Sequence, residues 1–179
     1  FYTNQKYTKK GIRLVTITDL HNPELDYDSM PFIELDKKLM DSFKVDVGDF
    51  LFARSGAIGR FGIATKNIPC VFASYIIRFK LNENFLLNNF LRFFLQTIFG
   101  VKQLNMIKQG GANININAEN IKSMKLILPP IPEQKQIASI LSNINEQITQ
   151  QQSHLTNLKV LRKSILNSKL TKEKTNVTN

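Results

Sequence analysis

The chain has 179 residues, of which 42% are apolar, and it carries a formal net charge of +10. This size predicts one ordinary domain with an extension, and the apolar content can support a hydrophobic core. No apolar run approaches the roughly 18 residues of a membrane span, and neither end resembles a signal peptide. With a single cysteine, Cys70, we expect a cytoplasmic protein without disulfides. The first residue is Phe1 rather than Met, which predicts a processed or truncated N-terminus.

The positive charge is concentrated in the middle of the chain. Residues 51–130 carry ten Lys or Arg and two acids, Glu83 and Glu119, whereas residues 1–50 carry seven Lys or Arg and nine Asp or Glu. A concentrated basic segment is the electrostatic footprint of a protein that binds a polyanion such as nucleic acid. A basic surface without a binding role stays open as the alternative.

Short strands are predicted in the first half of the chain by β-branched and aromatic residues. Val45 to Ala53 is typical of a turn that feeds a buried strand, and a loop with three-residue glycine spacing follows from Arg54 to Gly62. Lys37 to Phe43 predicts a helical turn. The other predicted strands are 12–17, 32–35, 63–65 and 71–81.

Helices dominate the next stretch. Apolar residues at three- and four-residue intervals predict an amphipathic helix over 85–99, closed by Gly100. A second short helix is expected over 101–107, a helical turn at Asn117 or Glu119, and a last strand over 124–128. Because strands and helices mix without a βαβ rhythm, we predict an α+β fold.

The sequence changes character at Pro129-Pro130-Ile131-Pro132. Prolines force an extended entry, although Pro132 can occupy the first turn of a helix. The residues from Glu133 to Leu170 include no Gly, Pro or aromatic residue, and as a helix they would span about 57 Å. We expect a globular domain over 1–131, a helix over 132–171 and a frayed tail over 172–179. The junction is expected to fix the angle between globule and helix.

Apolar residues in this helix follow a heptad pattern, which predicts a coiled coil. A lone helix of this length cannot bury such a seam, so we expect a homodimer. Residues 151–172 carry five basic residues and no acid, which favours antiparallel over parallel pairing because like charges repel. Arg162 would then lie near Leu141 of the second copy. The seam positions are Ile137, Leu141, Ile144, Ile148, Gln151, Leu155, Leu158, Arg162 and Ile165.

No self-sufficient active site is visible in the sequence. The glycines around Gly56 lack the spacing of a dinucleotide- or phosphate-binding loop, and two distant histidines with one cysteine are not a typical zinc set. Asp46 and Asp49 flank Gly48, where a turn role outweighs metal binding. We therefore expect no metal, no cofactor and no catalysis by this chain, which argues against a nuclease.

Two loops of the basic segment carry residue types that read DNA. Arg reads guanine and Asn or Gln reads adenine in the major groove, while Lys mainly neutralises phosphate. For any single residue, ordinary turn chemistry is the alternative. Two such loops joined to a dimerising helix make the joint case stronger. The candidate DNA-binding residues are Lys9, Lys10, Arg13, Arg54, Ser55, Arg60, Lys108, Gln109, Gly110, Asn113 and Asn115.

Several stretches resemble the specificity (S) subunits of type I restriction–modification systems. Residues 11–20, 48–56 and 110–116 are similar to parts of their target recognition domain. The most specific likeness is Leu128-Pro129-Pro130-Ile131-Pro132-Glu133-Gln134, which resembles the start of their spacer helix. The likeness covers nearly the whole chain.

The resemblance implies a non-catalytic DNA reader. Its helix would dock methyltransferase (M) subunits that carry the S-adenosylmethionine chemistry, with restriction (R) subunits as further partners. Such subunits usually have two recognition domains and two spacers, whereas this chain has one of each. Two antiparallel copies would restore a bipartite reader with a palindromic, interrupted target. The alternative, from another class, is a coiled-coil assembly adaptor whose globule binds protein.

Overall fold

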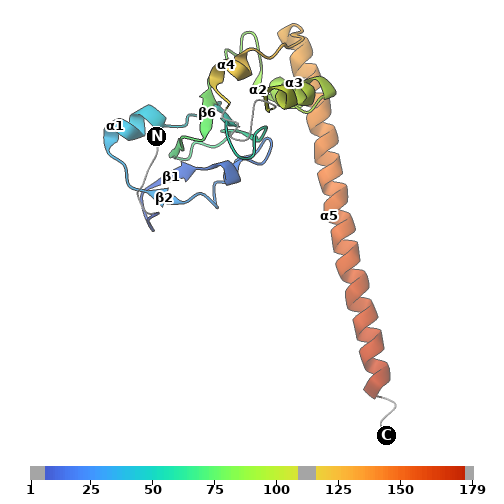
Figure 1. Cartoon of the computed structure of the whole chain (residues 1–179). Coiled ribbons are helices and arrows are strands. Elements are labelled where there is room, and N and C mark those ends of the chain that lie inside the picture. Colours follow the sequence, from blue (N-terminus) through green and yellow to red (C-terminus); the bar gives the residue numbers. More distant parts are fainter. Residues whose placement is uncertain (1–6, 109–115, 176–179) are drawn as a thin grey trace. The chain divides into compact units, whose positions relative to one another are not determined.

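A computed structural model describes residues 7–108 and 116–175, and the side chains of the last helix as far as residue 169. The chain divides into two compact units, Phe1–Lys135 and Gln136–Asn179. The first unit holds all strands and short helices, and most of the long helix α5 (Ile131–Thr175) forms the second (Figure 1). This α+β arrangement with a long C-terminal helix confirms the predicted fold class. None of the helices in the described ranges combines the length and hydropathy of a transmembrane segment.

Six short strands form two sheets of three. In the first sheet, β1 pairs antiparallel with β2 and parallel with β5; in the second, β3 pairs antiparallel with both β4 and β6. The strands are β1 (Ile12–Val15), β2 (Phe32–Ile33), β3 (Phe50–Ala53), β4 (Phe61–Ile63), β5 (Cys70–Phe72) and β6 (Ile76–Phe79). The remaining helices are η1 (Ile17–Asp19), α1 (Lys37–Phe43), α2 (Asn88–Phe94), α3 (Ile98–Lys108) and α4 (Ala118–Lys122).

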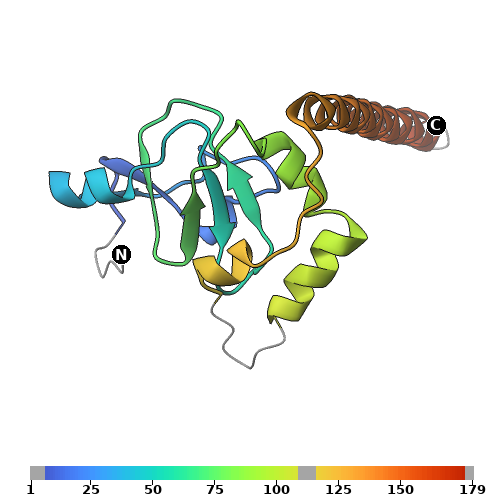
Figure 2. The ribbon, with the colours of Figure 1, turned by 90° about the horizontal axis from the view of Figure 1, so that it is seen from above.

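Strand β3 lies at the centre of the hydrophobic core. Successive side chains of a strand point to opposite faces, so Phe50 and Phe52 enter one cluster while Leu51 and Ala53 enter another. All four residues are buried. Residues of α2, α3 and α4 pack against the phenylalanine face (Figure 2). The predicted buried strand before Ala53 is therefore confirmed, with apolar neighbours on both sides.

The predicted strand over 71–81 is wrong, because this stretch forms two strands in different sheets. β5 pairs with β1, whereas β6 pairs with β3. A turn separates them, in which Ile76 N donates to Ala73 O at 3.0 Å. Each half finds its own long-range partner, and a continuous β-forming sequence cannot reveal that change of partner.

The predicted helix over 85–99 is also wrong: α2 covers only Asn88–Phe94 and a new helix begins at Ile98. Gly100 does not close a helix but lies inside α3. A Cβ at Gly100 would come within 2.3 Å of Phe94 O, so glycine is needed because α2 and α3 approach closely there. The second helix, predicted over 101–107, is confirmed with an earlier start.

Residues 124–128 form no strand, contrary to the prediction. Gln103 of α3 satisfies the backbone there instead: Lys125 N donates to Gln103 Oε1 at 2.7 Å, and Gln103 Nε2 donates to Lys125 O at 3.0 Å. The strand predicted over 63–65 is wrong in its bounds, because β4 covers Phe61–Ile63 and shares only Ile63 with the prediction. The helical turns at Lys37 and at Asn117 are confirmed, and the Asn117 side chain caps α4 by accepting from Asn120 N.

A buried carboxylate organises the loop between β1 and β2. Asp19, 1% exposed, accepts hydrogen bonds from Thr16 N at 2.7 Å, Thr16 Oγ1 at 2.8 Å and Ser29 Oγ at 2.8 Å. Nearby, Asn22 N donates to Phe61 O and Ile63 N donates to Pro23 O. This loop therefore pairs with the outer edge of β4 and covers it.

We predict that Asp19→Ala lowers the free energy of unfolding by about 2–4 kcal/mol, because it removes a buried carboxylate that accepts three part-buried hydrogen bonds. Urea denaturation followed by circular dichroism measures the change. Asp28→Ala, which removes an exposed carboxyl from the same loop, is the control and should change the free energy little. Equal effects of the two substitutions would contradict the assigned role of Asp19.

Candidate functional site

The glycine-containing loop after β3 is held in place by backbone hydrogen bonds from two other segments. Arg54 N donates to Tyr75 O at 2.9 Å, and Ile116 N donates to Arg54 O at 2.8 Å. Arg54 and Ser55 are half-buried, and Arg60 is exposed. The backbone of this loop is therefore anchored at the end of β3, which gives both arginines a rigid support.

The last residue of α3 lies against the same loop. Gly59 has φ +97°, and a Cβ placed on it would lie 3.2 Å from Lys108 Nζ. A side chain at Gly59 would be strained in this conformation and would crowd the lysine. The structure therefore brings Lys108 beside Gly59, the residue before Arg60, although 49 positions separate Gly59 and Lys108 in the sequence. We call Arg54, Ser55, Arg60, Tyr75 and Lys108 the candidate interface.

Four of the predicted DNA-binding residues, Gln109, Gly110, Asn113 and Asn115, lie outside the described residues. The residues that border this segment, Lys108 and Ile116, are both held against the loop after β3. The two loops singled out in the sequence are thus joined to each other through the described residues at their ends.

The remaining predicted residues lie near the N-terminal end of β1. Lys9 and Lys10 are exposed. Arg13 is engaged within the fold: its Nε donates to Tyr27 O at 3.1 Å, and its guanidinium lies 4.9 Å from the centre of the Phe32 ring. The contacts that assemble the candidate interface do not involve these three residues.

Sequence reasoning missed Tyr75 as a member of the candidate interface. Its side chain is 48% exposed in the turn between β5 and β6, and its carbonyl anchors Arg54. The expectation of one continuous strand over 71–81 hid this turn. The small residues Ala73 and Ser74, which interrupt a run of larger apolar side chains, were the available signal.

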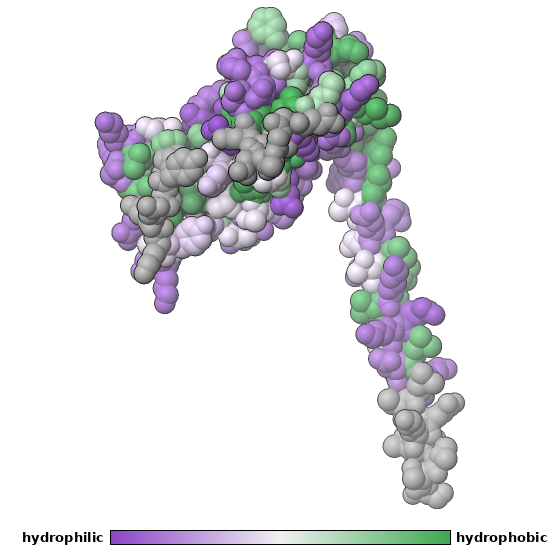
Figure 3. Space-filling model, viewed as in Figure 1, coloured by the Kyte–Doolittle hydropathy of each residue, from purple (hydrophilic) through white to green (hydrophobic). Residues whose placement is uncertain are grey.

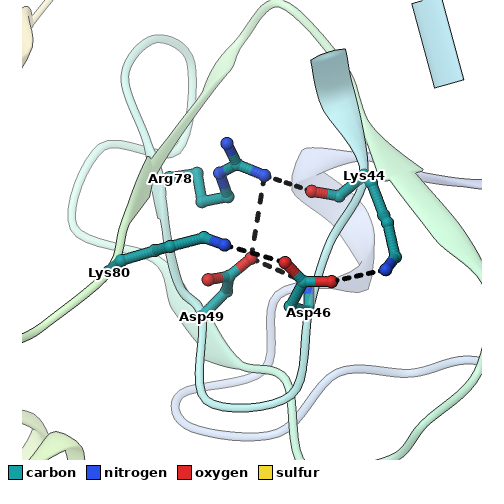
Figure 4. Close-up of polar contacts among 5 residues, drawn as sticks. All are labelled: Lys44, Asp46, Asp49, Arg78 and Lys80. Atoms are coloured by element: carbon teal, nitrogen blue, oxygen red, sulfur yellow. Dashed lines mark hydrogen bonds and ion pairs between the residues drawn. The ribbon is translucent and has the colours of Figure 1, made fainter. Parts of the chain in front are cut away.

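A separate cluster of charged side chains neutralises part of the basic segment (Figure 4). Asp46 pairs with Lys44 at 2.8 Å and with Lys80 at 2.7 Å, and Arg78 pairs with buried Asp49 and with the Lys44 carbonyl. The hydrogen bonds from Lys44 and then Lys80 lower the pKa of Asp46 to about 2. Arg78 and Lys80 therefore form ion pairs within the fold. The positive charge available to a polyanion is smaller than the count of Lys and Arg in this segment indicates.

The same cluster decides the role of the two aspartates around Gly48. Asp46 N donates to Asp49 Oδ2 at 2.8 Å and Asp49 N donates to Asp46 O at 3.1 Å, which closes the turn before β3. The predicted turn role is confirmed. Within residues 7–108 and 116–175, no group of three or more His, Cys, Asp or Glu side chains is placed to hold a metal ion.

Helix α5 presents the predicted heptad seam as an exposed apolar stripe. Ile137 and Leu141 are partly buried, Gln151 and Arg162 are exposed, and the five other positions are about half exposed: Ile144 45%, Ile148 49%, Leu155 51%, Leu158 48% and Ile165 50%. Apolar side chains are visible along the helix among hydrophilic ones (Figure 3). Exposed apolar residues also flank the seam: Ile140, Leu161 and Leu166.

Comparison with known proteins places this architecture in a family. Residues 1–159 match the family described as "Type I restriction modification DNA specificity domain". The chain belongs to this family. Family membership confirms the predicted resemblance and agrees with a subunit that recognises DNA without catalysing a reaction.

Individual relatives are similar over part of their length. The specificity subunit of the type I restriction enzyme EcoBI from Escherichia coli is 29% identical over 131 residues, which cover 72% of this chain and 27% of that protein. The HsdS subunit from Thermoanaerobacter tengcongensis has the same fold, with a TM-score of 0.56 at 14% identity over 82% of this chain and 33% of its own. A chain from a structural study of complex assembly in the type I R-M system gives a TM-score of 0.57 at 16% identity over 80% of this chain and 33% of its own.

The ion pairs of Asp46 predict a pH dependence of stability. Because the folded-state pKa lies below the ordinary value of 3.8, the pairs stabilise the fold above about pH 4 and are lost as the pH falls towards about 2. We expect Asp46→Asn to lower the urea midpoint at neutral pH and to match the wild type near pH 2. Added salt should shrink the difference at neutral pH, because Asp46 is 39% exposed. Asp28→Asn is the control, and a difference that does not change with pH would contradict this assignment.

Proposed function

We propose that this chain is the DNA-reading subunit, or half-subunit, of a type I restriction–modification complex. Residues up to 131 act as a target recognition domain, and the helix from 132 acts as a spacer. The observation that carries the proposal is the family match over residues 1–159. It is supported by the loop that carries Arg54 and Arg60, against which Lys108 lies at Gly59. The excess of positive charge over residues 51–130 supports double-stranded DNA as the ligand. We assign this subunit to the cytoplasm.

Within the candidate interface, the residues have different tasks. Arg54 and Arg60 reach base edges, where a guanidinium can bind guanine in a bidentate manner. Lys108 neutralises a phosphate, as a compact point charge does. Asn113 and Asn115 read bases together with Gln109, and Lys9, Lys10 and Arg13 contact the backbone of the duplex. Tyr75 supports Arg54 through its carbonyl, which fixes the register of the reading loop.

The exposed seam of α5 supports a homodimer. Full burial of a Leu or Ile side chain contributes about 1.5–3 kcal/mol, so seven apolar seam positions per helix favour association strongly. The positive charge of residues 151–172 favours the antiparallel arrangement. Two globules related by a two-fold axis would read a palindromic target with an interrupted centre.

The apolar residues that flank the seam support a second docking surface on α5. Ile140, Leu161 and Leu166 are each about half exposed and make the apolar stripe wider than a two-stranded coiled coil requires. This width suits further helices, which we assign to M subunits that bring S-adenosylmethionine chemistry to the target. R subunits would join the same complex. The match covers only 27% of the EcoBI relative, so the M and R subunits are proposed as partners of this chain.

A coiled-coil adaptor with a protein-binding globule is the second candidate. An apolar surface on α3 favours it, because Ile98 is 86% exposed and Phe99 is 71% exposed. The salt dependence of binding separates the two functions. The affinity for DNA falls steeply as the salt concentration rises, because counterion release becomes less favourable, whereas the affinity of an apolar surface for protein does not. Affinity for protein without affinity for DNA would favour the adaptor.

The reading role is tested by selecting bound sequences from a random DNA pool with the purified protein. We expect an interrupted palindrome for the wild type. Arg54→Ala should relax the preference at one position of each half-site, and Lys108→Ala should weaken all sequences alike while reducing the salt slope by about one. Lys37→Ala, an exposed lysine outside the interface, is the charge-matched control for Lys108→Ala. Unchanged sequence profiles and affinities in both interface variants would contradict the assigned site.

The direction of pairing is tested by cysteine cross-linking. Antiparallel helices place residue 162 of one copy near residue 141 of the other, so a mixture of Arg162→Cys and Leu141→Cys chains should cross-link to each other. Parallel helices would instead cross-link Arg162→Cys to its own copy, which would overturn the antiparallel proposal. Gln151→Cys should cross-link to itself in either arrangement and serves as the positive control. Cys70 is buried and stays as it is.

A further inference from the structure

The first turn of α5 is fastened to the globular unit by one buried side chain. Gln134 is 0% exposed. Its Nε2 donates to the carbonyl oxygens of Phe85 and Pro129, both at 2.8 Å, and its Oε1 accepts from Leu87 N at 3.1 Å. Both amide hydrogens and the amide oxygen are thus engaged, and every partner is a backbone group whose position the fold defines.

Besides satisfying its own buried amide, Gln134 joins three segments of the chain. Leu87 is the N-cap residue of α2, which has no side-chain cap of its own, so Gln134 supplies an acceptor at that helix entrance. Pro129 belongs to the proline segment that leads into α5. One side chain therefore joins the chain before α5, the first turn of α5 and the start of α2.

The contacts continue from α2 towards the reading loop. Asn88, the first residue of α2, is buried and donates from Nδ2 to Gly48 O at 2.7 Å. Gly48 is in the turn that the two aspartates close before β3, and β3 ends at Ala53, one residue before Arg54. A short series of hydrogen-bonded backbone segments thus links Gln134 to the anchored arginine. All of these residues belong to the unit that ends at Lys135.

We propose that Gln134 is a positioning residue that sets the spacing between half-sites, an inference that rests on the proposed function. In a dimer joined through α5, the separation of the two reading loops depends on how firmly each globule is held at the first turn of the helix. A globule of about 135 residues has a radius of gyration of about 14 Å. A pivot of about 15° would move a loop about 25 Å from the junction by about 7 Å, or about two base pairs at about 3.4 Å each. Restricting this pivot selects one spacer length.

Gln134→Met tests the proposal, because methionine has similar length and volume but leaves the three backbone partners without their hydrogen bonds. The probe is a set of duplexes with the half-sites selected by the wild type, separated by spacers that differ by one base pair. We expect the wild type to prefer one spacer length by about tenfold or more and Gln134→Met to distinguish neighbouring lengths by about threefold or less. The base preference within each half-site should stay unchanged.

Gln136→Met is the matched control, since Gln136 is exposed two residues further along the same helix, and it should keep the wild-type spacer profile. Gln134→Asn, which shortens the side chain by one methylene, should give an intermediate profile and serves if Gln134→Met does not fold by circular dichroism. A folded Gln134→Met protein with the wild-type spacer profile would overturn the proposal. Equal loss of base and spacer preference, or loss of folding in both variants, would also overturn it and leave Gln134 a purely structural role.

Failure of the proposed function has a different signature. A wild-type protein that selects no sequence at any spacer length would remove DNA recognition itself. A wild-type protein that selects half-sites but tolerates every spacer length would preserve recognition and overturn only the role assigned to Gln134.

Discussion

Burial of β3 on both faces is the constraint on which the globular unit depends. Phe50 and Phe52 pack against α2, α3 and α4, while Leu51 and Ala53 pack into the cluster that contains β1 and the loop after it. A strand with both faces buried has little freedom to shift, because any register change would place its side chains on the wrong face. The loop that begins at Arg54 therefore starts from a fixed point.

Charge in this protein is distributed according to two different needs. One set of cations forms ion pairs within the globular unit: Lys44, Arg78 and Lys80 pair with the aspartates of the turn before β3. The other set, with Arg60 and Lys108, lies at the loop after β3, at the opposite end of the same strand. Two of the acids, Asp46 and Asp49, are thus paired with cations at the turn before β3, at the other end of the strand from Arg54.

Helix α5 is stabilised in a different way from the globular unit. The described side chains from residue 143 to 169 are all exposed, so this part of the helix gains little from burial within its own chain. Its helicity comes from residues that favour helix and from the absence of Gly and Pro after Pro132, while its apolar stripe remains for partners.

The sequence by itself determined the elements whose signal is local. A long helix after the proline junction follows from its composition, the start of α4 from Asn117, the turn before β3 from its paired aspartates, and the family from the proline junction and glycine segments. Tertiary structure decided whatever depends on a distant partner. Gly100 is required by the close approach of Phe94, and the backbone at Lys125 pairs with Gln103 rather than with a strand. Residues 71–81 divide between two sheets, which exposes Tyr75. In the sequence, Gln134 is an ordinary polar residue of a polar helix. In the fold its side chain holds the start of that helix, because it forms hydrogen bonds with the backbone of Phe85 and Leu87. Local patterns reflect the chain's own period and composition, whereas these features depend on backbone groups that only folding brings together.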